Sequence, residues 1–232
     1  MLKKTCRNHA NLTSRRFCSI LLYCVLTICC VPVIYGQSDN NSSSDNRTEQ
    51  EIFTEKLVAA AIERTAHLVV YDGSYRKIAY PGGDVPANVG VCTDEIVRIY
   101  RALGIDLQKE VHEDMRKNFA IYPKNWGLKS PDTNIDHRRV PNLQTFFTRR
   151  GEKLGVSSDA GDYLPGNLVT WMLPGNLPHI GIVTDRRSED GLRPLMVHNI
   201  GGGPVLEDML FTYKITGHYC YPAKPARSSH SE

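Results

Sequence analysis

Cysteine is scarce in most of this chain. Five of the seven cysteines fall within the first 36 residues, which leaves only Cys92 and Cys220 for the rest of the sequence. The chain also lacks the CxxC and HExxH patterns that mark common zinc sites. The run His112-Glu113-Asp114 has the wrong spacing for ligation from one face of a helix. These absences argue against metal chemistry, and we expect neither a metal nor a cofactor.

An excess of positive charge is also missing once the first 36 residues are set aside. That segment contains five Lys and Arg and no Asp or Glu, so the remainder carries 23 basic and 25 acidic side chains. Its net charge is therefore −2, although the full chain has +3. Nucleic-acid binding needs a basic surface. The charge balance gives no support for a nucleic-acid partner.

The N-terminus has the pattern of an export signal. Basic residues between Lys3 and Arg16 precede an uncharged run over 17–35, and Gly36 ends an acceptable cleavage site. The same run is just long enough to remain as a membrane anchor. We expect residues 1–36 to be a signal peptide or membrane anchor, with possible membrane attachment through 17–35. The protein is then exported, and either periplasmic or associated with the envelope.

Composition divides the rest of the chain into three parts. Residues 37–50 are rich in Ser, Asn and Asp, which predicts a flexible linker. Residues 51–222 have a globular composition and the length of one domain. Residues 223–232 are polar, and we expect a disordered tail.

Hydrophobic periodicity changes near residue 160. Apolar residues follow a helical spacing before that point and short alternating or apolar runs after it. The expected helices are 51–68, 93–103, 107–119 and 141–151, and the expected strands are 167–172, 180–185, 195–199 and 211–219. Helices followed by strands predict an α+β domain in which N-terminal helices pack on a small antiparallel sheet.

Three residues in this framework form the inventory of a cysteine hydrolase. Cys92 begins the second expected helix, where free N–H groups favour a thiolate. His179 lies on an expected strand and His198 ends the next one, so antiparallel pairing can bring the two together. The first histidine suits a general base and the second a group that orients it. An alternative is a disulfide between Cys92 and Cys220, which leaves no nucleophile.

A tyrosine can complete the site by donating a hydrogen bond to a developing oxyanion, beside the N–H of Cys92. We assign this role to Tyr80, which lies in a Pro- and Gly-containing loop twelve residues before Cys92. Tyr71 and Tyr75 compete with it for the same role.

The ordered motifs resemble the NlpC/p60 branch of papain-like cysteine peptidases. The shared pattern is a tyrosine, a cysteine that opens a helix, Pro-Gly-x-Leu-Val-x-Trp at 165–171, His-Ile-Gly-Ile-Val at 179–183 and a further histidine. The chain also looks like an uncharacterised family of exported bacterial proteins within that superfamily. It departs from the pattern at Val91, at Thr93-Asp94 and at Asn167. The resemblance implies a papain-like NlpC-type fold and cleavage of peptidoglycan stem peptides without a metal.

The resemblance carries over to roles for particular residues. Cys92 is then the nucleophile, His179 the base, His198 the orienting residue and Tyr80 the oxyanion helper. Three basic residues in the long stretch between cysteine and base are candidates for binding a stem-peptide carboxylate: His137, Arg138 and Arg139. The competing interpretation of that stretch is a solvated loop.

The sequence therefore predicts an exported thiol hydrolase that cleaves an amide bond in peptidoglycan stem peptides or a related envelope substrate. Two alternatives stay open. One is a non-catalytic envelope-binding module with Cys92 in a disulfide. The other is an acyl transferase on the same fold. The oligomeric state is not indicated by the sequence.

Overall fold

The computed structural model describes residues 47–223. The expected signal or anchor (1–36), nearly all of the expected linker (37–46) and the tail from residue 224 lie outside the described residues. Within 47–223 no helix is long and apolar enough to cross a membrane. The described residues belong to a single compact unit.

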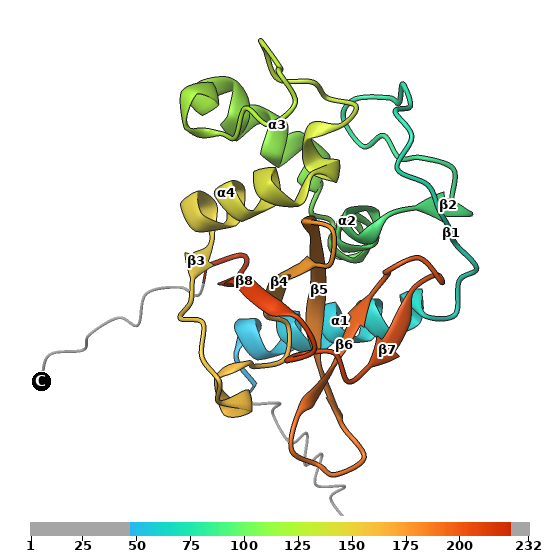
Figure 1. Ribbon diagram of the computed structural model, residues 1–232, viewed down its shortest axis with the longest axis vertical. Coiled ribbons are helices and arrows are strands. Elements are labelled where there is room, and N and C mark those ends of the chain that lie inside the picture. Colours follow the sequence, from blue (N-terminus) through green and yellow to red (C-terminus); the bar gives the residue numbers. More distant parts are fainter. Residues whose placement is uncertain (1–46, 224–232) are drawn as a thin grey trace, which may run out of the picture. The chain divides into compact units, whose positions relative to one another are not determined.

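The described domain is α+β, as the change of period predicts (Figure 1). Its four α-helices precede the strands of the main sheet and are α1 (Glu49–Arg64), α2 (Cys92–Ala102), α3 (Leu107–Asn118) and α4 (Val140–Arg150). Short 3-10 turns are η1 (Phe119–Ile121), η2 (Asp136–Arg138) and η3 (Ala160–Asp162).

The main sheet has six antiparallel strands in the order β3-β8-β4-β5-β6-β7. Their bounds are β3 (Glu152–Lys153), β4 (Leu168–Leu173), β5 (Leu177–Arg187), β6 (Pro194–His198), β7 (Val205–Glu207) and β8 (Lys214–Cys220). A separate parallel pair joins β1 (Val70–Tyr71) to β2 (Val89–Gly90). The order places β5 between β4 and β6, near the middle of the sheet.

The first helix begins earlier than the composition predicts. Thr48 caps α1, because its hydroxyl accepts from the Glu51 N–H at 3.2 Å and the Glu51 carboxylate accepts from the Thr48 N–H at 2.7 Å. This capping box fixes the start of the helix at Glu49. Residues 49 and 50 therefore belong to the domain and not to the linker.

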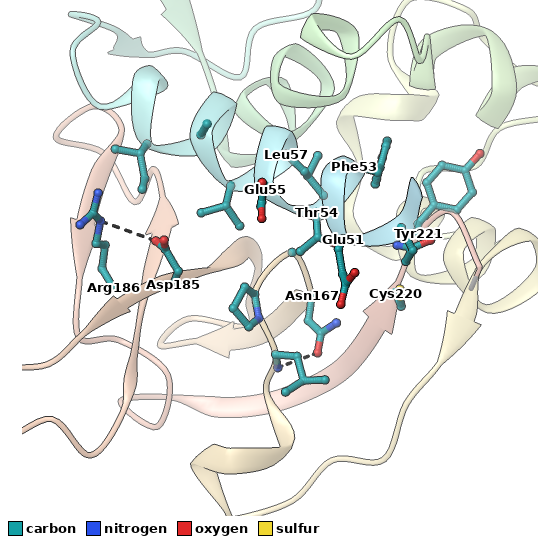
Figure 2. A pocket seen from close by; sticks show the side chains of 17 residues that line it. Glu51, Phe53, Thr54, Glu55, Leu57, Asn167, Asp185, Arg186, Cys220 and Tyr221 are labelled. Carbon is teal, nitrogen blue, oxygen red and sulfur yellow. Dashed lines mark hydrogen bonds and ion pairs between the residues drawn. The ribbon is translucent and has the colours of Figure 1, made fainter. Parts of the chain in front are cut away.

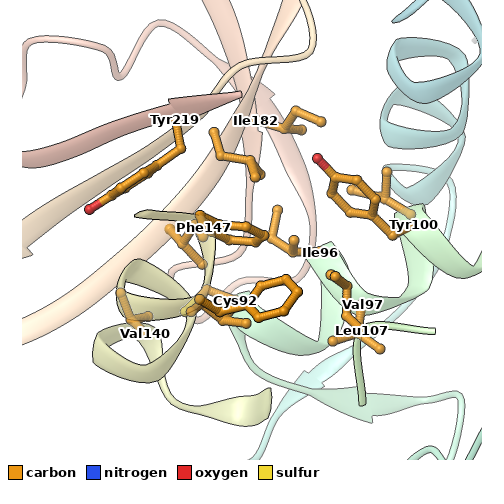
Figure 3. Packing of buried hydrophobic residues seen from close by; sticks show 14 of the residues in the cluster. Cys92, Ile96, Val97, Tyr100, Leu107, Val140, Phe147, Ile182 and Tyr219 are labelled. Carbon is orange, nitrogen blue, oxygen red and sulfur yellow. The ribbon is translucent and has the colours of Figure 1, made fainter. Parts of the chain in front are cut away.

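The two faces of the sheet carry separate apolar cores. Ile180 and Ile182 of β5 face the larger core, which includes residues of all four helices (Figure 3). Trp171 and Val183 belong to a smaller core on the other face. Successive strand residues point to opposite faces, so this division fixes the face of every residue on β5. Helices α1 and α2 both pack against β5 (Figure 1).

Candidate active site

Cys92 is the first residue of α2 and is 4% exposed. The preceding strand β2 ends at Gly90, so the chain turns directly from a strand into the helix. The Asp94 carboxylate accepts a hydrogen bond from the Val91 N–H at 2.7 Å, which stabilises this turn. The sequence prediction that Cys92 opens a helix is confirmed within one residue.

The Cys92 sulfur meets β5 at the edge where β6 ends. The N–H groups of Ile180 and Thr93 lie close enough to the sulfur to lower the pKa of the thiol. The Val183 N–H points toward the β4 side, where it donates to the Asn167 carbonyl. The N–H groups of successive strand residues point to opposite sides, so the N–H of Ile180, three residues earlier, points toward the β6 side. The pairing of β5 with β6 reaches only as far as Gly181 and His198. The sulfur therefore occupies the place that the next residue of β6 would take.

His179 adjoins this contact because it directly precedes Ile180. The Ile180 nitrogen is bonded to the carbonyl carbon of His179, so this contact brings the sulfur close to the His179 backbone. Alternation puts the His179 side chain on the face that carries Trp171, and the ring centroids of the two lie 5.9 Å apart. The thiol contact and the histidine are thus neighbours along β5.

The two predicted histidines are in direct contact. Nε2 of His179 lies 3.1 Å from Nδ1 of His198, and both side chains are 1% exposed. Gly181 makes this possible, because a Cβ atom there would lie 3.0 Å from the His198 Cβ and 3.2 Å from the Trp171 ring. Nδ1 of His179 makes no hydrogen bond to another residue of 47–223. That nitrogen is left available to accept a proton.

Burial determines the protonation of the site at neutral pH. Burial raises the pKa of the Cys92 thiol to about 11. The N–H groups of Ile180 and Thr93 and the Tyr71 hydroxyl lower this pKa, but their effect is smaller than that of burial. The pKa of His179 is lowered to about 3, first by burial and then by the neighbouring His198. Both directions favour a neutral thiol beside a neutral imidazole. The expected thiolate at the helix start is therefore not the resting state, because desolvation outweighs the helix N-terminus.

Tyr71 and not Tyr80 is the tyrosine at Cys92. The Tyr71 hydroxyl lies close enough to the thiol and the N–H of Cys92 for the two side chains to shift each other's pKa. Burial and the neighbouring Cys92 raise its pKa above the usual range. Tyr80 instead packs edge-on against His112, with ring centroids 5.1 Å apart. The assignment of Tyr80 is wrong because the parallel pairing of β1 with β2 places Tyr71 opposite Gly90, two residues before the cysteine.

Arg138 is a structural residue, which corrects its expected role in substrate binding. Its guanidinium binds both oxygens of Asp94, at 2.8 and 3.0 Å, and donates to the carbonyls of Ser74 and Asp72 at 3.0 and 3.2 Å. The side chains of Arg138 and Asp94 are 1% and 2% exposed. The ion pair therefore ties the first turn of α2 to the segment that follows Tyr71.

The other two basic residues of this stretch also depart from the prediction. His137 is buried, and its pKa is lowered to about 3 by desolvation and then by Arg138 and Arg101. It is not placed to meet a substrate carboxylate. Arg139 is half-buried, with its guanidinium carbon 4.2 Å from the centre of the Trp126 ring. Residues 131–140 are packed against the protein, so the solvated-loop interpretation is wrong for the part of the stretch that holds these three residues.

Glu207 is a residue of the site that the sequence analysis missed. Its Oε1 lies 2.8 Å from Nε2 of His198, off the axis of the ring N–H. His198 pairs with Val205 across β6 and β7, so Glu207 is the diagonal neighbour on the same face. The glycine run at 201–203 predicts a loop and hides the short strand β7 behind it. The short run Val205-Leu206-Glu207 is the only signal in the sequence for this strand.

Cys92 is a free thiol and is not joined to Cys220 by a disulfide. Cys220 lies on β8, where its sulfur is 3.6 Å from the Pro222 carbonyl. The alternative in which a disulfide removes the nucleophile is therefore wrong for this structure. Within 47–223 no group of three His, Cys, Asp or Glu residues is arranged to hold a metal ion.

A prominent cavity lies elsewhere. It has a volume of about 610 Å³ and lies between α1 and the loop that leads into β4, with Cys220 and Tyr221 at one end (Figure 2). None of Cys92, His179 and His198 lines it. The chemistry of the thiol and histidines, rather than cavity size, identifies the candidate site.

The domain has a buried cysteine at the start of a helix and a pair of histidines on a sheet. It belongs to a recognised family. Residues 58–221 match the family described as a domain of unknown function, DUF1287, and the chain belongs to that family. It is 49% identical over 168 residues to the "Uncharacterized protein YijF" of Escherichia coli (strain K12), which covers 72% of this chain and 82% of that protein. This family is distinct from NlpC/p60, so the resemblance to the NlpC/p60 branch is wrong as a family assignment.

Proposed function

We propose that this protein is an exported thiol hydrolase that cleaves an amide bond in peptidoglycan stem peptides or a related envelope peptide. One observation carries the proposal. The Cys92 thiol, at the start of α2, contacts β5 at Ile180, the residue that follows His179, and the rings of His179 and His198 lie 3.1 Å apart. A nucleophile, a base and an orienting group then stand in sequence.

The roles follow from the available atoms. His179 takes the thiol proton on Nδ1 as the Cys92 sulfur attacks the amide carbon. The carbonyl oxygen becomes an oxyanion, which the Cys92 N–H and the Tyr71 hydroxyl are placed to receive. His179 then returns its proton to the leaving amine, and a thioester remains. Water, deprotonated by the same nitrogen, hydrolyses the thioester and restores the thiol. A papain-like description of the fold is part of this proposal and is supported by the same layout.

The location and substrate rest on different support. The basic and apolar pattern of 1–36 and the polar linker after it favour export. A relative of the domain occurs in a bacterium, Escherichia coli. Peptidoglycan is the amide-rich polymer of a bacterial periplasm, and stem peptides are therefore our proposed substrate. Cell fractionation tests the location, since recovery of the whole protein in the cytosol with residues 1–36 intact would contradict it.

Burial favours a second candidate, acyl transfer. Cys92 is 4% exposed and both histidines are 1% exposed, so bulk water has little access to a thioester formed there. A primary amine that binds with the acyl donor then competes well with water. The two candidates share every step up to the thioester and differ only in the acceptor.

The test is digestion of purified peptidoglycan and of synthetic stem peptides, with products identified by mass spectrometry. We expect new free amino and carboxyl ends with the wild-type chain and none with Cys92→Ala. His179→Ala should nearly abolish turnover, whereas Cys220→Ser, the matched change at the other thiol, should leave it intact. Addition of an amine acceptor separates hydrolase from transferase. Wild-type product formation by Cys92→Ala would end the thiol-hydrolase proposal.

A further inference from the structure

Glu207 stands at the solvent end of a line of three side chains. Its carboxylate is 53% exposed, whereas the His198 side chain next to it is fully buried. From Glu207 the line runs 2.8 Å to Nε2 of His198, and from Nδ1 of His198 it runs 3.1 Å to Nε2 of His179. It ends at Nδ1 of His179. The other three ring nitrogens of the line each have one neighbour in it.

The Glu207 carboxylate determines which atoms donate and which accept along this line of side chains. An ionised carboxylate only accepts hydrogen bonds. The favourable arrangement therefore has a proton on Nε2 of His198, facing Glu207. Burial lowers the pKa of His198, so the ring is neutral and its Nδ1 carries a lone pair. That lone pair accepts the proton on Nε2 of His179.

The second histidine then has only one possible tautomer. His179 is neutral and holds its proton on Nε2, so its Nδ1 is unprotonated. The reverse order, with protons on both Nδ1 atoms, would block the nitrogen that must receive the thiol proton. It would also leave two acceptors, Nε2 of His198 and the carboxylate, facing each other at 2.8 Å.

We propose that Glu207 is a positioning residue that fixes both histidines as Nε2–H tautomers and so keeps Nδ1 of His179 free to act as the base. The inference rests on the proposed function only for its consequence in catalysis. Glu207 does not touch the reacting atoms. Its effect passes through His198, which explains why an exposed carboxylate on a three-residue strand is part of a buried site.

The tautomers can be read directly by ¹⁵N NMR of the full-length chain labelled with [¹⁵N]histidine, without substrate. His179→Asn and His198→Asn assign the two rings. In the wild-type protein, Nδ1 of each ring should resonate in the range of an unprotonated nitrogen and Nε2 in that of a protonated one. A protonated Nδ1 on either ring would overturn the inference, whether or not Glu207→Ala folds.

The variant Glu207→Ala provides a second test of the inference. Loss of the acceptor should shift the Nδ1 resonance of His179 toward the protonated range, as the reverse tautomer becomes populated. Asp208→Ala is the matched control, because it removes the neighbouring carboxylate, which pairs with Arg193 at 2.7 Å. It should leave both rings unchanged. Unaltered resonances in Glu207→Ala, or equal shifts in Asp208→Ala, would overturn the role of Glu207.

The two proposals fail separately. If no amide substrate is cleaved but the tautomers are as expected, the hydrolase function fails and the role of Glu207 stands. If the protein cleaves peptides and the tautomers are reversed, only the role of Glu207 fails. In an active enzyme, Glu207→Ala should lower kcat more than it changes KM, because the carboxylate orients the base and does not bind substrate.

Discussion

Replacing Arg138 with methionine should lower the free energy of unfolding of the domain and should not weaken substrate binding. The side chains of Arg138 and Asp94 are 1% and 2% exposed, and the guanidinium makes hydrogen bonds to the carboxylate and to two carbonyls. Removal of one partner leaves a buried charge without compensation, which typically costs about 3–5 kcal/mol. Methionine keeps most of the volume, so little of this loss is due to a cavity.

The assay is urea denaturation followed by circular dichroism, with thermal melting as a second measure. For a domain of this size, a loss of about 3–5 kcal/mol corresponds to a fall in Tm of roughly 6–20 °C. In the Arg138→Met background, Asp94→Asn should reduce the free energy of unfolding by less than it does in the wild-type protein. The reason is that Asp94→Asn removes the unpaired charge that Arg138→Met leaves behind.

Arg139→Met is the matched control. Arg139 is the next residue along the chain, but its side chain is 15% exposed and lies 3.8 Å from Asp136, beyond hydrogen-bond distance. Arg139→Met should lose less stability than Arg138→Met, because no hydrogen bond to a carboxylate is broken. If Arg138→Met were no less stable than Arg139→Met, or if it changed only the KM for substrate, the structural role given to Arg138 would be wrong.

Three further predictions follow from the site and its surroundings. In a Cys220→Ser background, iodoacetamide should modify folded Cys92 more slowly at pH 7 than it modifies the urea-unfolded chain, because burial raises the pKa of the thiol to about 11; equal rates would contradict this. Tyr71→Phe should lower turnover by roughly tenfold to a thousandfold if the hydroxyl holds the oxyanion, while Tyr80→Phe, measured in the same peptide assay, should not. Burial raises the pKa of Asp136 from 3.8 to about 6, so the folded state binds a proton that the unfolded state has released between these pH values. Stability should therefore fall as pH rises from about 4 to 6, and Asp136→Asn should remove this part of the pH dependence in urea titrations.

The elements that the sequence predicted well are those with a local signature. The helix after Cys92 has an amphipathic pattern, and the strands around His179 and His198 alternate and are separated by turn residues. Antiparallel neighbours joined by a short turn then bring the histidines together without further information. The structure confirms their contact at 3.1 Å, whereas their catalytic roles stay predictions.

The errors have a common physical source, which is contact between residues distant in sequence. Tyr71, Tyr75 and Tyr80 share one irregular segment, and only the pairing of β1 with β2 selects Tyr71. Arg138 meets Asp94 across 44 residues, in a stretch whose Pro, Asn and Asp content is typical of a solvated loop. Glu207 follows a glycine run that conceals its strand. No periodicity or spacing in the chain encodes these three contacts.

If Cys92 is the nucleophile and His179 the base, as we propose, the two groups would separate charge only when a substrate is present. Burial raises the pKa of Cys92 to about 11 and lowers that of His179 to about 3, so the neutral pair is the resting form. The same low-polarity surroundings strengthen the attraction between a thiolate and an imidazolium once both form together. The Ile180 N–H then stabilises the sulfur, and His198 stabilises the ring. Cys92 is therefore expected to act by concerted proton transfer to His179, and a resting thiolate is not required for attack.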